Sequence, residues 1–184
     1  MKANLSRLSD DETARTDPEC ALQRAENLAI LGAKSVLELC VGPSLRVLGR
    51  AYREHGISVV GNDLERRWMD YYPEGTWIKG DALAIDWSQF DAVVFAPPVT
   101  RGCTGRRVDA LRISEVNPSY AAFMARPYDG LRCMVLPARS IATSEDRKEF
   151  FDLMSGIKSH YDVVPLHAER RRIRKYVDVY YRSV

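Results

Sequence analysis

Short apolar runs alternate with amphipathic stretches along most of this chain. The apolar runs are typical of β-strands, whereas in the amphipathic stretches apolar residues recur every three or four positions, as in helices. The predicted strands are residues 35–40, 57–62, 76–80, 90–96, 131–137, 160–166 and 176–182. The predicted helices are residues 18–33, 44–55, 64–70, 118–126 and 144–155. Strands that alternate with helices predict an α/β fold.

The composition of the strands predicts how they are arranged. Runs 93–95 and 134–136 are apolar at every position, as expected of a parallel sheet that helices cover on both faces. Only a loop separates the last two strands, and because a parallel crossover needs more chain, this pair should be antiparallel. We therefore predict a doubly wound, three-layer αβα sandwich with a mostly parallel seven-stranded sheet and an antiparallel C-terminal strand.

Two of the predicted helices have a clear apolar face. In helix 18–33 the positions at helical spacing are Leu22, Ala25, Leu28, Ala29 and Leu31. Helix 44–55 turns Leu45, Leu48 and Tyr52 inward, and turns Arg46, Arg50 and Arg53 outward. Residues 1–17 lack such a pattern and are predicted to be a flexible N-terminal arm, which leaves residues 18–184 as a single domain.

Composition narrows the class of protein. The 184 residues are 46% hydrophobic and 28% charged, which is ordinary for a globular domain with a core of its own. No apolar run approaches the ~20 residues of a membrane span, and the N-terminus lacks the apolar segment of a signal peptide. The four cysteines are not spaced as metal ligands or as a disulfide framework. We therefore expect a cytoplasmic protein that binds no metal.

Positive charge is concentrated in two segments. The net charge is only +2, but residues 101–107 and 170–175 are strongly basic. Such clusters bind phosphate-rich partners in some proteins and are simply solvated loops in others. Charge alone leaves both interpretations open.

Turns and acids follow the first four predicted strands. The residues within or just after these strand ends are Glu38, Cys40, Gly42, Ser44, Asp63, Asp81 and the segment Ala96-Pro97-Pro98. Ligands of open α/β sheets bind outside the carboxyl ends of the strands. The sequence therefore predicts a ligand site at this edge of the sheet.

The chemistry of these residues suits a nucleotide-like cofactor. Gly42 would let a ligand approach the backbone, and Asp63 follows about 20 residues later, where an acid typically accepts hydrogen bonds from ribose hydroxyls. Asp81 would accept a hydrogen bond from a purine amine, and Glu38 would order water or an ammonium group. Each also has an ordinary explanation, namely a plain turn at Gly42 and Asp81 and a helix N-cap at Asp63. Their occurrence together at consecutive strand ends favours the cofactor.

Through these motifs the chain resembles the class I, Rossmann-like, S-adenosylmethionine-dependent methyltransferases. The resemblance rests on 36-VLELCVGPS-44, Asp63, Asp81-Ala82 and 96-APPV-99, and it runs from about residue 20 to the C-terminus. It implies S-adenosylmethionine as the cofactor, with Glu38 and Gly42 at its methionine end. The cofactor-binding residues that it implies are Glu38, Cys40, Gly42, Ser44, Asp63, Leu64, Asp81, Ala82 and Ala96. Pro97 and Pro98 would lie beside the methyl group and act only by positioning.

The chain departs from the family pattern at two places. Cys40 and Ser44 stand where many members have glycine, so their side chains make the turn less open to the cofactor. Many amino-group methyltransferases have Asn or Asp before the Pro-Pro pair and an aromatic residue after it. Here these positions are Ala96 and Val99, which provide neither a side-chain acceptor for a target amine nor a stacking ring.

The acceptor of the methyl group is predicted from the long loop 97–120. Its Arg101, Arg106 and Arg107 would neutralise phosphates, and Tyr120 would stack on a base or belong to the core. The favoured hypothesis is a methyltransferase that acts on a nucleic acid or a nucleotide-like acceptor. The alternatives are a methyltransferase acting on a small acidic metabolite and a non-catalytic module that binds S-adenosylmethionine.

Overall fold

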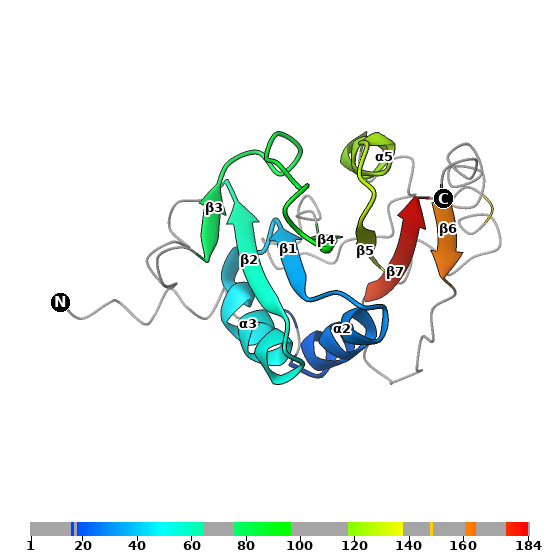
Figure 1. Cartoon of the computed structure of the whole chain (residues 1–184). Helices are drawn as coiled ribbons and strands as arrows, with labels where there is room; N and C mark the ends of the chain where they lie inside the picture. Colours follow the sequence, from blue (N-terminus) through cyan, green and yellow to red (C-terminus); the bar gives the residue numbers. More distant parts are fainter. Residues whose placement is uncertain are drawn as a thin grey trace.

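A seven-stranded sheet organises the part of the chain that the structure describes (Figure 1). The structure is a computed structural model, and it describes residues 16, 18–64, 76–96, 118–137, 148, 161–164 and 176–183. The strands are β1 (Ser35–Leu39), β2 (Ser58–Asp63), β3 (Trp77–Lys79), β4 (Ala92–Phe95), β5 (Leu131–Pro137), β6 (Tyr161–Val164) and β7 (Tyr176–Ser183). Their order across the sheet is β3-β2-β1-β4-β5-β7-β6.

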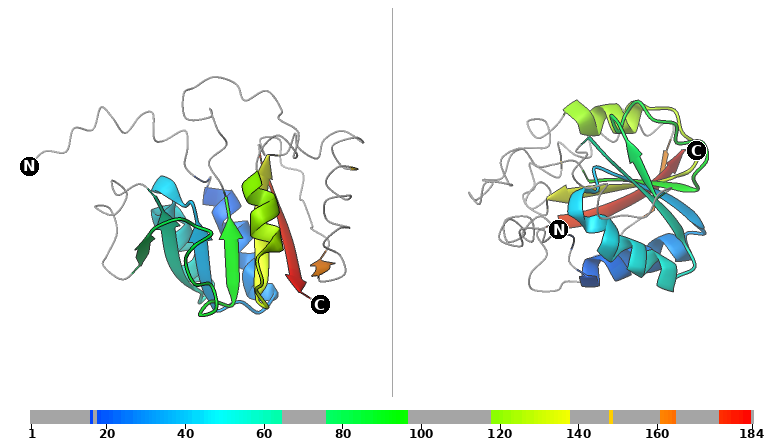
Figure 2. Two further views of the ribbon diagram at one scale, coloured as in Figure 1. Left: turned by 90° about the horizontal axis from the view of Figure 1, so that it is seen from above. Right: turned by 90° about the vertical axis from the view of Figure 1, so that its left-hand side faces the viewer.

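Most neighbouring strands are parallel. β1 pairs with β2 and β4, β2 with β3, and β4 with β5, all in parallel. β7 is antiparallel to both β5 and β6, and in Figure 2 its arrow points opposite to that of β4. The mostly parallel sheet and the antiparallel pairing of the last two strands are thus confirmed.

Helices lie on both faces of the sheet. α2 (Pro18–Ile30) and α3 (Leu45–Glu54) cover one face, and α5 (Pro118–Ala125) covers the other (Figures 1 and 2). One apolar cluster joins α2 and α3 to the sheet, and a second joins α5 to it. The helix predicted over 64–70 lies outside the described residues beyond Leu64, and so does the helix predicted over 144–155 apart from Lys148.

α3 divides its faces as the sequence predicts. Leu45, Leu48 and Tyr52 are buried against the sheet, while the three arginines of the helix are exposed. Among the described residues, no helix is long and apolar enough to cross a membrane.

The sheet has a topological switch point between β1 and β4. From β1 the chain crosses to β2 on one side, whereas β4 pairs on the other side. The connections leaving β1 and β4 therefore diverge, and the carboxyl edge at such a switch point is where open α/β sheets bind their ligands. Gly61 brings the turn after β1 close to β2, because a Cβ there would lie 2.7 Å from Leu45 Cδ2 and 2.9 Å from Val41 Cγ1.

Candidate functional site

The turn after β1 and the acid that ends β2 meet at the switch point. A short 3₁₀ turn, η2 (Gly42–Ser44), connects β1 to α3. The Gly42 N–H donates a hydrogen bond of 2.9 Å to Asp63 Oδ2. Gly42 has a φ of +50°, a left-handed conformation that glycine adopts without steric cost. Two segments that the sequence separates by 21 residues thus form one side of the candidate site.

Cys40 lies near the carboxylates of Asp63 and Asp81 at this edge. It has a φ of +56°, which is uncommon for a residue with a side chain and typical of functional sites when the surroundings enforce it. Burial, together with the nearby Asp63 and Asp81 carboxylates, raises the pKa of the Cys40 thiol to about 12. The thiol is therefore neutral near pH 7 and is not an activated nucleophile. The same influences show that both acids lie close to the turn after β1.

Asn62 fixes the end of β3 beside β2. Its buried side-chain amide donates hydrogen bonds of 3.0 Å to the carbonyl groups of Ile78 and Gly80. Asp81 follows directly, and its Oδ1 accepts a 2.9 Å hydrogen bond from the Leu83 N–H. Asp81 therefore forms the turn that the sequence offered as its ordinary role, in an exposed position next to Asp63. Asn62 was not singled out from the sequence, although an amide inside an otherwise apolar strand is a visible signal.

Three further predicted residues border this edge. Leu64 is 67% exposed directly after Asp63. Ser44 is buried, and its Oγ accepts a 2.8 Å hydrogen bond from the backbone N–H of Thr16, so the chain just before α2 passes over the turn. Ala96 is partly buried immediately beyond β4.

The sequence predicted that Glu38 would contact water or a ligand, but its side chain is buried inside the protein instead. Its side chain is 1% exposed and points toward α2 and α3, where it contacts Arg24 at 3.4 Å and accepts a hydrogen bond from the Tyr52 hydroxyl. Arg24 also binds Asp178 of β7 through hydrogen bonds of 2.6 and 3.1 Å. Burial raises the pKa of the Glu38 carboxyl, while Arg24 and the Tyr52 hydrogen bond oppose that rise. A buried acid is tolerated here because a buried arginine and a phenol surround it.

Two other predicted site residues belong to the core. Tyr120 is 1% exposed, its hydroxyl donates a 2.7 Å hydrogen bond to the Val135 carbonyl, and its ring packs edge-on against Phe95. It is therefore not available to stack on a base, which corrects that prediction. Ala82 is also buried, and its carbonyl accepts a 3.2 Å hydrogen bond from the Trp87 indole N–H.

The remaining predicted site residues lie outside the described part of the chain. They are Pro97, Pro98, Arg101, Arg106 and Arg107. Their roles beside the methyl group and on phosphates stay predictions.

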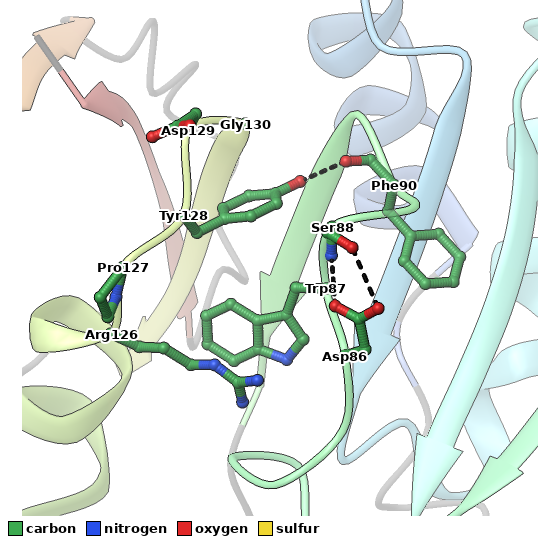
Figure 3. A pocket seen from close by; sticks show the side chains of 9 residues that line it. All are labelled: Asp86, Trp87, Ser88, Phe90, Arg126, Pro127, Tyr128, Asp129 and Gly130. Atoms are coloured by element: carbon green, nitrogen blue, oxygen red, sulfur yellow. Dashed lines mark hydrogen bonds between the residues drawn. The ribbon is translucent and has the colours of Figure 1, made fainter.

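A hollow of about 330 Å³ lies at the opposite edge of the sheet (Figure 3). It is lined by residues 86–88 and 90, before β4, and by residues 126–130, before β5, so it is at the amino ends of these strands. Arg126 lies 4.1 Å from the centre of the Trp87 ring, and the Tyr128 hydroxyl donates a 2.6 Å hydrogen bond to the Phe90 carbonyl. These side chains contact other residues of the hollow, and the hollow lies at the edge of the sheet opposite the candidate site.

Solved structures with a similar fold are methyltransferases. An O-methyltransferase from Bacillus cereus, in complex with SAH (S-adenosylhomocysteine), matches with a TM-score of 0.54 at 14% identity, over 92% of this chain and 82% of that one. The methyltransferase domain of a bacterial Hen1 protein gives a TM-score of 0.55 at 16% identity, over 90% and 97% of the two chains. The chain has a class I methyltransferase fold. A candidate O-methyltransferase from Nostoc punctiforme matches with a TM-score of 0.54 at 13% identity over 91% of this chain, which spans only 56% of its length.

Sequence comparison adds no closer relative. No family model matches the chain, and no curated protein matches it. At identities of 13 to 16% the structural similarity defines the fold, while the chemistry must be argued from the site.

Proposed function

We propose that this protein is an S-adenosylmethionine-dependent methyltransferase whose cofactor binds in the crevice at the carboxyl ends of β1, β2 and β3. The observation that carries the proposal is the hydrogen bond between the Gly42 N–H and Asp63 Oδ2 at the switch point of the sheet. It joins a glycine turn to an acid at the place where open α/β sheets bind their ligands.

The residues at this crevice fit the adenosine part of the cofactor. Asp63 would accept hydrogen bonds from ribose hydroxyls, since a carboxylate has roughly four acceptor positions and the Gly42 N–H holds this one at the turn. Exposed Leu64 offers an apolar surface for a purine ring next to that acid. Among the described atoms a Cβ at Gly42 would meet only Asp63 Oδ2, at 3.9 Å, so there is room for a ligand at Gly42 itself, while the segment at Thr16 passes over Ser44.

These residues bind and orient rather than react. Asp63 and the turn around Gly42 would hold the ribose, Leu64 the purine face, and Asp81 the purine amine. When bound, S-adenosylmethionine supplies an electrophilic methyl group on a sulfonium that needs no further activation. The neutral Cys40 thiol does not compete for that methyl group, because a thiolate is the reactive form of cysteine. Positioning of the acceptor can account for much of the catalysis in such a site.

The proposed acceptor is a nucleic acid or a nucleotide-like molecule. Its support is the sequence of the loop after β4, which places Arg101, Arg106 and Arg107 within a few residues of the Pro-Pro pair. A small acidic metabolite would suit the same arginines. Ala96, in place of a polar acceptor, favours the third possibility of a module that binds the cofactor without catalysis.

Methyl transfer from labelled cofactor tests the proposal. The protein is incubated with methyl-labelled S-adenosylmethionine and, separately, with RNA, DNA and a pool of small metabolites. We expect label in nuclease-sensitive polymer. Label in the metabolite pool alone would show that the acceptor is a small metabolite and not a nucleic acid. Cofactor binding without transfer to any acceptor would favour the non-catalytic module.

A further inference from the structure

α3 presents a basic surface that the proposed cofactor site does not use. Arg46, Arg50 and Arg53 are exposed on one side of the helix, opposite the buried Leu48 and Tyr52. With Glu54 they line a shallow hollow of about 500 Å³. We call these three arginines the α3 basic stripe. The stripe and Glu54 together carry a net charge of +2 on one helical face.

The stripe as a whole adds little to the stability of its helix, although Arg53 in the last turn complements the negative end of the helix dipole. α3 has no acid in its first turn, where Arg46 instead opposes the positive end of the helix dipole. Arg46 and Arg50 are four residues apart, a spacing at which like charges repel. The Arg50–Glu54 pair, at 3.1 Å, has the arginine before the acid, which is the weaker order, and Arg50 is 82% exposed. A role in binding accounts for these arginines better than a role in folding.

The stripe begins beside the candidate cofactor site. α3 follows η2 directly, so Arg46 lies within one helical turn of the Gly42–Ser44 segment. From Arg46 to Arg53 the stripe extends roughly 10 Å along the helix axis, at about 1.5 Å per residue. A stripe of this length can contact more than one phosphate of a nucleic-acid strand. Guanidinium groups bind phosphate oxygens in pairs, so arginine suits this partner better than lysine does.

We propose that the α3 basic stripe binds the phosphate backbone of a nucleic-acid strand whose reactive nucleotide reaches the carboxyl edge of the sheet. This inference rests on the proposed function, since it assigns a binding surface to the acceptor of the same site. A strand that runs along α3 passes from Arg53, near the amino edge where β2 begins, to Arg46, beside the crevice at the carboxyl edge.

Binding of a fluorescein-labelled 20-nucleotide RNA, followed by anisotropy from low to high salt, tests this surface. The test variant is R46Q/R53Q, which keeps Arg50 and its pair with Glu54. The control is K34Q/R182Q, which removes the same charge at the amino edge of the sheet. For a single strand, each lost phosphate contact makes the slope of log affinity against log salt less steep by about 0.7. We therefore expect the slope of R46Q/R53Q to be less steep by about 1.4, and its RNA affinity at low salt to be weaker on the order of tenfold. The control should match the wild type.

Several results would overturn the inference. One is RNA binding by R46Q/R53Q that equals that of the wild type, and another is an equal loss of RNA affinity in the control variant. The others are no RNA binding by the wild type at low salt, and displacement of the labelled RNA by polyglutamate as effectively as by unlabelled RNA. S-adenosylhomocysteine binding, measured by calorimetry on each variant, keeps the two proposals apart. If the compound binds all variants equally while RNA binding does not respond, the stripe is excluded and the proposed cofactor remains. If the wild type does not bind it, the proposed function itself fails.

Discussion

At the scale of single residues, Arg24 is a buried charged side chain that links α2 to two strands. It is 4% exposed and is held by the carboxylates of Glu38 and Asp178. We expect Arg24→Met to lower the free energy of unfolding by about 3–5 kcal/mol, because it leaves two acids near one another without their cation. Chemical denaturation measures the change. The control is Glu26→Gln on the exposed face of α2, which should change it by less than about 0.5 kcal/mol.

Tyr120 distinguishes a core residue from a substrate-binding one. Tyr120→Phe keeps the ring against Phe95 and removes only the hydroxyl that donates to the Val135 carbonyl. We expect a loss of stability of about 1 kcal/mol and no change in acceptor affinity. An acceptor KM that rises tenfold in this variant, with stability unchanged, would restore Tyr120 to the substrate site.

At the scale of elements, the packing of the β1–α3 turn against β2 depends on one glycine. A Cβ at Gly61 would overlap Leu45 and Val41 at less than 3 Å, whereas a Cβ at Gly49 would meet Val59 at an ordinary 3.8 Å. Gly61→Ala should therefore cost about 1–3 kcal/mol, while Gly49→Ala within α3 should stabilise by about 0.5–1 kcal/mol. Thermal unfolding of the two variants measures this difference. Equal effects would show that the turn has room to shift.

Elements with a strong pattern were predictable from the sequence. The predicted range 131–137 coincides with β5, and the two faces of α3 were assigned correctly, because apolar periodicity reports burial directly. In α2 the same reasoning treated Leu22 as part of the apolar face, but Leu22 is 40% exposed while Arg24 is buried. Periodicity cannot identify a buried arginine, since its partners Glu38 and Asp178 lie on strands 14 and 154 residues away.

The same limit applies to the candidate site. The meeting of Gly42 and Asp63 follows from strand order and was predictable once the parallel sheet was recognised. The burial of Glu38 was not, because an acid inside a strand can face either side of the sheet near its open end. The hydrogen bonds of Asn62 to β3 depend on the register between two strands, which the sequence alone does not specify.

At the scale of the whole molecule, the buried acid makes stability depend on pH. The pKa of Glu38 is raised in the folded state above its ordinary value of 4.5. Between pH 4.5 and the folded pKa, the folded protein therefore holds a proton that the unfolded chain loses. This contribution to stability is complete below pH 4.5 and disappears as the pH rises through the folded pKa. Because Glu38→Gln lacks the titration, the unfolding free energy of the wild type relative to that variant should fall as the pH rises. A difference that grows with pH, measured by urea denaturation, would contradict this.

The most direct test of the proposed function is calorimetric titration with S-adenosylhomocysteine. We expect the wild type to bind it and Asp63→Asn to bind about 10- to 150-fold more weakly, as befits the loss of a hydrogen bond to a charged group worth about 1.5–3 kcal/mol. Asp129→Asn, an exposed acid at the amino edge, serves as the matched control and should bind like the wild type. No heat with S-adenosylhomocysteine or S-adenosylmethionine at millimolar concentration, while NAD binds, would contradict the assignment of this site.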